Sequence, residues 1–167
     1  MPDTAEYLAR IRDHALSGDP LEFQRHTPGL ITELMASASP KKLTERPTEN
    51  KWSIAEILAH LAEDEIATAW RYRQMVEHDG IDLAGFDQDL WARLGNYRSR
   101  SPHQSLQLFQ LLRAANLAFL EQLSPGQWDC CGMHAERGRI TVRDLAAHMA
   151  GHDTNHVEQI RRILGAA

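Results

Sequence analysis

The chain has 167 residues, of which 43% are hydrophobic and 25% are charged, and its formal net charge is -5. This length predicts one domain, residues 1–167, with a sizeable core, and the composition is typical of an ordinary soluble globular protein. The net negative charge and the lack of a Lys/Arg cluster exclude nucleic acid as the main partner, and no run of eighteen apolar residues is present to span a membrane.

Two features of the sequence bear on cellular location: the first residues and the cysteines. The opening residues carry neither a cationic start nor an apolar run, so we expect no secretory signal. Cys130 and Cys131 are the only cysteines, and adjacent cysteines have poor geometry for an ordinary disulfide. A reducing cytoplasm is therefore expected, with both thiols unremarkable in a loop.

The first third of the chain predicts two short helices and a loop. An amphipathic accessory helix is expected from Thr4 to Leu16, within residues 1–18, and Gly18-Asp19-Pro20 should end it. A second helix should begin at Thr27-Pro28, where the hydroxyl can cap free N–H groups and proline suits the first helical position, and end near Ser37. The polar residues and two prolines of Ser39–Lys51 predict a loop.

The third helix is expected to be the longest. Ser53 and Glu56 form a predicted capping box at its start, and Asp79-Gly80 should end it. Its predicted inward stripe consists of Ile57, Leu61, Thr68, Tyr72 and Met75. A mixed region follows from Ile81 to Pro102, with a short helix around Gln88–Leu94.

The last third predicts two more long helices. One runs from about His103 to Leu123 and should bury Leu108, Leu112, Phe109, Phe119 and Leu120. After a loop from Gln127 to Ile140, a capped start at Thr141–Asp144 leads into a final helix that ends near Leu164, before Gly165. Because no segment alternates with period two over a useful length, we expect an all-α four-helix bundle with extra short N-terminal helices.

Two histidines interrupt the apolar stripe of the final helix. His152 and His156 lie near the middle of a stripe that Leu145, Met149 and Ile160 define. A buried imidazole needs hydrogen-bond partners, so a face used only for packing would carry leucine there. Four residues apart on one face, the two rings can turn their nitrogens onto one metal ion.

A third ligand should come from a facing helix, and His60, one turn beyond Glu56, is the candidate. We therefore expect one divalent ion on His60, His152 and His156, with Zn or Ni as the first choices and Fe or Mn also open. The competing interpretation is that these are buried histidines with ordinary hydrogen-bond partners.

Other site types fit the same residues less well. In His152-Asp153-x-x-His156 the acid is one carbon shorter than the glutamate of H-E-x-x-H zinc proteases, and a di-iron bundle needs Glu-x-x-His spacing on two helices, which is absent. Glu65 could orient a ligand, act as a base or pair with an arginine, and His148 could support a ligand or face solvent.

Two further polar residues complete the candidates. Asn116 is expected to tie bundle helices together. His134 is placed in the loop before the last helix, where it could overhang the metal site.

Two segments resemble signatures of the DinB-like (DinB/YfiT) superfamily. One is Lys51-Trp52-Ser53-Ile54-Ala55-Glu56-Ile57-Leu58-Ala59-His60-Leu61, followed by Glu65, and the other is Ala150-Gly151-His152-Asp153-Thr154-Asn155-His156-Val157-Glu158-Gln159-Ile160. The likeness extends from about Gly18 to the C-terminus. It implies a four-helix bundle, often dimeric, with a three-histidine metal site at His60, His152 and His156. Many last-helix signatures of the family run H-R-G-Q, whereas Val157-Glu158-Gln159 follows His156 here, which leaves the subfamily undefined.

Three protein ligands leave at least one coordination position for water or substrate, which is typical of catalytic sites. The expected function is therefore a metal-dependent enzyme acting on a small molecule, as a hydrolase or as a low-molecular-weight-thiol S-transferase of the kind this superfamily includes. The alternative is a non-catalytic metal-binding or stress-associated bundle. A homodimer is the expected assembly.

Overall fold

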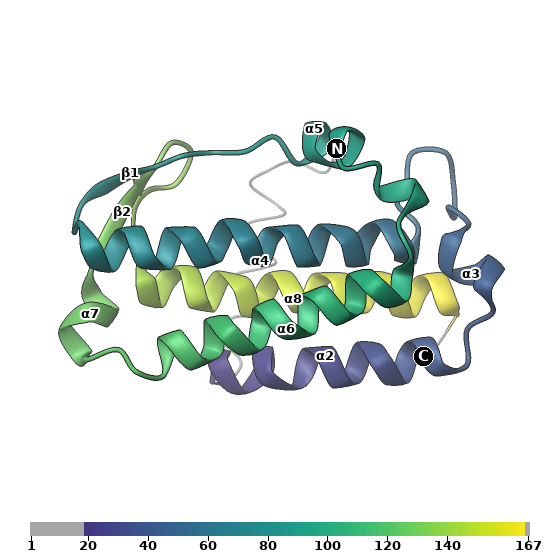
Figure 1. Cartoon of the computed structure of the whole chain (residues 1–167), viewed down its shortest axis with the longest axis horizontal. Coiled ribbons are helices and arrows are strands. Elements are labelled where there is room, and N and C mark those ends of the chain that lie inside the picture. The colour runs from purple at the N-terminus through teal and green to yellow at the C-terminus, as the bar shows by residue number, and fades with distance from the viewer. Residues whose placement is uncertain (1–18, 166–167) are drawn as a thin grey trace.

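The computed structural model describes residues 19–165, and its long helices α2, α4, α6 and α8 lie side by side (Figure 1). The elements, in chain order, are α2 (Pro20–Ala36), α3 (Pro40–Thr44), α4 (Ile54–Glu77), β1 (Ile81–Leu83), α5 (Gln88–Leu94), η1 (Tyr97–Ser99), α6 (Pro102–Leu120), α7 (Pro125–Asp129), β2 (Cys131–His134), β3 (Gly138–Thr141) and α8 (Val142–Leu164). The predicted four-helix bundle is confirmed. The accessory helix expected at Thr4–Leu16 lies outside the described residues.

The helices pack mainly in two pairs, α4 with α6 and α2 with α8. Their inward faces form two groups of buried side chains. One group includes Ile31, Ile57 and Phe109, and the other includes Tyr72, Leu120 and Leu145. Between residues 19 and 165, no helix is both long and apolar enough to cross a membrane.

Helix α2 begins seven residues earlier than the sequence predicts. Asp19 caps it by accepting a hydrogen bond from the Leu21 N–H, and Pro20 occupies the first turn, so the segment expected to end a helix starts one. Pro28 lies inside the helix, where it cannot donate to the carbonyl of Gln24. That carbonyl instead accepts a hydrogen bond from Arg113 at 3.0 Å, so the proline is accommodated.

A three-stranded sheet, in the order β1-β2-β3, closes one end of the bundle and was not predicted. β1 pairs with β2 in parallel, and β2 pairs with β3 antiparallel. The strands have only three or four residues, which is too short for a period-two pattern to be recognised. The short helix α3 lies within the expected loop Ser39–Lys51 and was missed, because five residues are too few to show a helical period.

The ends of α4 and α8 follow the sequence closely. Capping boxes are present at Ser53 and Glu56 and at Thr141 and Asp144, and Gly165 ends α8 in a left-handed conformation with φ 71°. The predicted stripe of α4 is buried throughout. In α6, however, Leu108 is 39% exposed, because the buried face of that helix is centred on Phe109, Arg113 and Asn116.

An ionised arginine, Arg113, lies at the centre of the bundle with 1% of its surface exposed. From α6 its guanidinium donates to Glu65 of α4 at 2.8 Å, to Asp153 of α8 at 2.9 Å and to the Gln24 carbonyl of α2. Burial acts to lower the pKa of Arg113, but the charges and hydrogen bonds of the two carboxylates outweigh it and raise that pKa. One side chain thereby links all four long helices.

Replacing Arg113 by alanine should lower the free energy of unfolding by about 3–5 kcal/mol, because two buried carboxylates would lose their cation. Urea unfolding monitored by circular dichroism measures this change. Arg143→Ala is the control, since Arg143 is 63% exposed and pairs with Asp129 at 3.7 Å. A control loss above about 1 kcal/mol, or an Arg113→Ala loss below it, would contradict the assignment.

Candidate metal centre

Three buried histidines meet between α4 and α8. The Nε2 atom of His152 lies 3.0 Å from Nε2 of His60 and 3.2 Å from Nε2 of His156. One ring nitrogen from each residue lies within 4.8 Å of the others. The structure therefore brings together all three histidines that the sequence selected, from helices about ninety residues apart in the chain.

The arrangement fits a metal ion on two grounds. Nitrogens bound at 2.0–2.1 Å lie roughly 3.3 Å apart at a tetrahedral angle and roughly 2.9 Å apart at a right angle, and both observed distances fall in this range. In addition, three converging ring nitrogens cannot all be hydrogen-bonded to one another, because each neutral imidazole has a single N–H group. A cation shared by their lone pairs would resolve this.

Burial keeps the rings in the form that binds a metal. Desolvation lowers the pKa of His60 and of His152 well below the usual value, and the neighbouring histidines add to the effect. A metal ligand must be a neutral imidazole. His60 and His152 are therefore held in the neutral form that can bind a metal ion.

The outer nitrogens of two rings face polar side chains that the sequence analysis missed. The Nδ1 of His156 lies 3.0 Å from Oε1 of Gln159, so the ring donates there and its Nε2 lone pair faces the cluster. The Nδ1 of His152 lies 3.6 Å from Oδ2 of Asp64. Both positions carry a weak sequence signal, since Gln159 is three residues after His156 and Asp64 is four residues after His60.

Asp64 is buried, and the pKa of its carboxyl is raised. Desolvation and the charge of Glu65 raise its pKa to about 7, against the opposing charge of Arg71. A group with this pKa can hold or release a proton near neutral pH.

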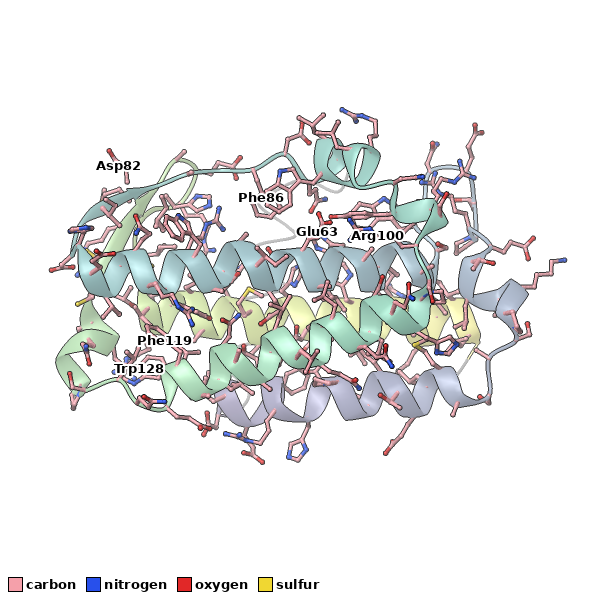
Figure 2. All side chains as sticks on the ribbon, in the orientation of Figure 1. Glu63, Asp82, Phe86, Arg100, Phe119 and Trp128 are labelled. Carbon is pink, nitrogen blue, oxygen red and sulfur yellow. The ribbon has the colours of Figure 1, made fainter. Side chains whose placement is uncertain are left out.

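The segment after α5 contacts α4 and the Trp52 ring, which packs against His60. The Tyr97 hydroxyl donates to Glu63 at 2.7 Å, and Arg100 forms an ion pair with the same carboxylate above α4 (Figure 2). The ring of Trp52 lies between this group and the histidines, 6.2 Å from the Tyr97 ring and 5.1 Å from the His60 ring. Trp52 therefore contacts both the Tyr97 ring and the His60 ring.

The remaining candidate residues have separate roles. Glu65 pairs with Arg113 and accepts from Asn116, so of its three expected roles the arginine pair is the one observed, and Asn116 links helices as predicted. His148 is half-buried, with its ring 6.3 Å from that of His152. His134 lies in β2, and its ring is not one of the three that converge.

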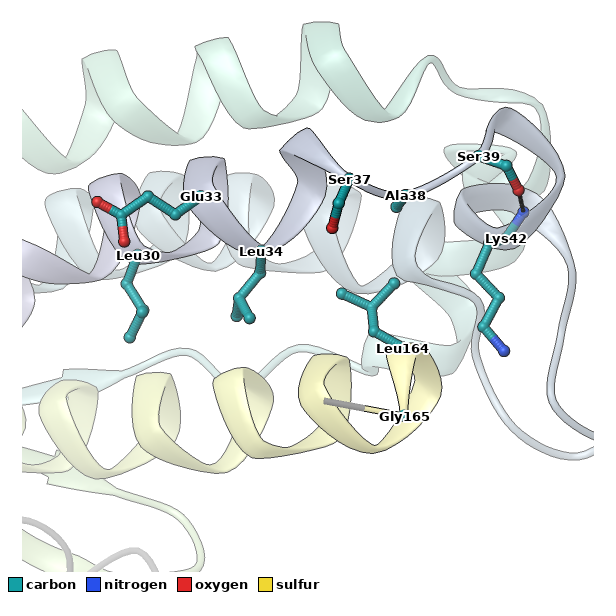
Figure 3. A pocket seen from close by; sticks show the side chains of 9 residues that line it. All are labelled: Leu30, Glu33, Leu34, Ser37, Ala38, Ser39, Lys42, Leu164 and Gly165. Carbon is teal, nitrogen blue, oxygen red and sulfur yellow. Dashed lines mark hydrogen bonds between the residues drawn. The ribbon is translucent and has the colours of Figure 1, made fainter. Parts of the chain in front are cut away.

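A surface pocket elsewhere can be set aside as the metal centre. It opens where the ends of α2 and α8 meet, and no histidine lines it (Figure 3). Its walls are formed by Leu30, Glu33, Leu34, Ser37, Ala38, Ser39, Lys42, Leu164 and Gly165. Cys130 and Cys131 are free thiols, and Cys131 lies in β2 rather than in the expected loop.

His148 generates a pH prediction. Burial, followed by the charge of Arg137, lowers its pKa to about 3, whereas an unfolded histidine has a pKa near 6.5. Its contribution to stability is complete above pH 6.5 and is lost as the pH falls below that value, because the unfolded chain takes up the proton first. His148→Gln should therefore reduce the stability loss between pH 7.5 and pH 5 by up to about 2 kcal/mol. Urea unfolding with chelator present tests this; equal losses in variant and parent would contradict it.

Comparison with known proteins agrees with the fold and identifies the family. The sequence profile of the DinB superfamily matches residues 24–160. A relative from Oceanobacillus iheyensis, named "putative metal-dependent hydrolase", is 21% identical over 131 residues, which is 78% of this chain and 75% of the relative. YfiT from Bacillus subtilis carries the same name and is 18% identical over 149 residues, covering 87% of this chain and 84% of YfiT.

Two solved structures share the fold. YfiT from Bacillus subtilis, described as having an unusual four-helix bundle topology, superposes with a TM-score of 0.79 at 18% identity and covers 89% of this chain and 87% of its own. The mycothiol-dependent maleylpyruvate isomerase superposes with a TM-score of 0.66 at 14% identity, over 89% of this chain and 60% of the isomerase. With its profile match, its helical bundle and its histidine cluster, the chain belongs to the DinB superfamily.

Proposed function

We propose that this protein is a metal-dependent hydrolase that acts on a small molecule and holds one divalent ion on His60, His152 and His156. The observation that carries the proposal is the convergence of three buried imidazoles through their Nε2 atoms. The names of the curated relatives support the reaction class. Zn or Ni suits three imidazoles best, and Fe or Mn is the second choice.

An ion with three protein ligands supplies a Lewis acid with an open position, where a water or thiol becomes a stronger nucleophile near neutral pH. The chain's own residues prepare the surroundings. The rings present lone pairs, Gln159 holds the proton side of His156, and Trp52 packs against His60. Asp64, with its pKa of about 7, is placed to accept or return a proton beside His152.

A thiol-dependent S-transferase is the second candidate. It is favoured by the shared fold of the mycothiol-dependent maleylpyruvate isomerase, whose printed name states its thiol dependence. In this case the partner would be a low-molecular-weight thiol, whose sulfur binds the metal as a thiolate. A non-catalytic metal-binding bundle is the outcome if neither activity is found. The homodimer, the single domain over residues 1–167 and the cytoplasmic location stay predictions.

Metal binding should stabilise the folded protein, because the unfolded chain has no preformed site. Zn²⁺ at about a hundred times its dissociation constant should raise the melting temperature by roughly 5–10 °C, and a chelator should reverse the rise. His156→Ala should abolish the difference, whereas the exposed His26, which pairs with Glu22, provides the control His26→Ala. A rise that survives in His156→Ala would show that His156 is not a ligand.

Turnover separates the enzyme from the binder. The metal-loaded protein is offered panels of esters, of amides, and of a thiol with electrophilic acceptors. Hydrolysis of an ester or amide should fall at least roughly 100-fold in His152→Ala, whose helix content is checked by circular dichroism. Activity only in the thiol panel would support the S-transferase, and no rate above that of the variant in any panel would support the non-catalytic bundle.

A further inference from the structure

Asp64 differs from every other buried carboxylate between residues 19 and 165. Those others are Glu56, Glu65 and Asp153. Glu56 pairs with Arg46, and both Glu65 and Asp153 pair with Arg113. In the described part of the chain, no lysine or arginine lies within ion-pair distance of Asp64. An unpaired buried carboxylate is costly, so its retention calls for a specific partner.

The nearest nitrogen partner recorded for Asp64 is a ligand histidine. Its Oδ2 lies 3.6 Å from Nδ1 of His152, and each of the two side chains is about nine-tenths buried. The Nδ1 of His152 is buried and has no hydrogen-bond partner among the described residues. A buried ring nitrogen without a hydrogen-bond partner and a carboxylate without an arginine or lysine partner thus face each other across a gap that a shift of about 0.7 Å would close to an N–H···O bond.

The outer nitrogen of His156 already has the hydrogen-bond partner that the outer nitrogen of His152 lacks. Its Nδ1 donates to Gln159 at 3.0 Å while its Nε2 faces the cluster. A hydrogen bond to the outer nitrogen fixes the tautomer and the ring orientation of a metal-binding histidine and raises its basicity. His152 faces the cluster through Nε2 as well, so its Nδ1 requires the equivalent acceptor.

We infer that Asp64 is the positioning residue of His152. Its carboxylate accepts the Nδ1–H, which leaves the Nε2 lone pair directed at the centre of the three-histidine cluster. Asp64 supplies a negative charge in the position where Gln159 supplies a neutral amide, so the two ligands of α8 differ in basicity. This inference rests on the proposed metal centre.

Arg71 is the alternative partner for Asp64, and its contacts lie elsewhere. Its guanidinium donates to the Ala84 carbonyl at 2.8 Å and lies over the Phe86 ring at 5.5 Å. It acts on Asp64 through charge alone. Asp64 therefore makes no direct contact with Arg71 that would explain its retention by a purely structural role.

The test measures Zn²⁺ affinity by competition with a chromophoric chelator. Asp64→Ala should raise the dissociation constant by roughly 10–100-fold, and Asp64→Asn by less, because an amide oxygen still accepts but carries no charge. Glu77→Gln is the matched control, since Glu77 is an exposed carboxylate on the same helix and its loss changes the net charge equally. An Asp64→Ala constant within about threefold of the parent, or an equal loss in Glu77→Gln, would overturn the inference.

Two measurements on the metal-free protein distinguish positioning from structure. Long-range ¹H–¹⁵N spectra should show His152 protonated at Nδ1 in the parent and as a mixture of tautomers in Asp64→Ala. The melting temperature of metal-free Asp64→Asn should stay the same or rise, because the amide oxygen still accepts the Nδ1–H while a buried charge is removed. A fall in that temperature, with no change in tautomer, would show a structural role instead.

The outcomes also separate this inference from the proposed function. If the parent binds no Zn²⁺, the proposed metal centre fails and the inference fails with it. If the parent and Asp64→Ala bind Zn²⁺ equally, the metal centre stands and only the role of Asp64 is rejected. If Asp64→Ala binds weakly but the parent hydrolyses nothing, the positioning role stands for a metal-binding protein without turnover.

Discussion

The structure depends on one buried cation. Arg113 reaches from α6 to a carboxylate on α4, a carboxylate on α8 and a backbone carbonyl on α2, so it sets how the four helices face one another. Its two carboxylate partners are neighbours in sequence of the residues at the metal centre: Glu65 follows Asp64, and Asp153 follows His152. The ion pairs of Arg113 and the histidine cluster therefore use adjacent residues on the same turns of α4 and α8. Hydrophobic contacts supply most of the driving force for folding, but they are tolerant of small rotations, whereas a charged fork with three acceptors is not.

Much of this could be read from the sequence, because the relevant signals are local. The capping boxes at Ser53 and Thr141 and the glycine at Gly165 fixed helix ends to within a residue or two. The pair His152 and His156 was recognisable because imidazoles at helical spacing interrupt an apolar stripe. His60 was harder to select, and the family resemblance contributed most of the reason for choosing it. The fold class followed from periodicity alone.

What the sequence did not reveal depends on contacts between distant segments. Asp64 is an ordinary polar residue of α4 until the facing helix α8 places His152 against it. Gln159 contacts His156 of its own helix, and its spacing of three residues was only a weak signal. Thr27-Pro28 has the residues of a helix start, yet α2 continues through it. The Gln24 carbonyl, which Pro28 cannot serve as a donor, accepts a hydrogen bond from Arg113 instead. β1 pairs with β2 from a segment some fifty residues away, and all three strands have only three or four residues, which is too little pattern to detect them.

Pro28 therefore couples the backbone of an outer helix to the charged centre of the molecule. In most helices, exchanging an interior proline for alanine restores a backbone hydrogen bond and is a gain. In α2 the restored amide would compete with a guanidinium for the same oxygen of Gln24, so the local improvement would weaken the anchor of α6. The missing backbone hydrogen bond at Pro28 thus leaves the Gln24 carbonyl free to bind Arg113 of α6. Pro28 and Arg113 are therefore expected to tolerate substitution only together.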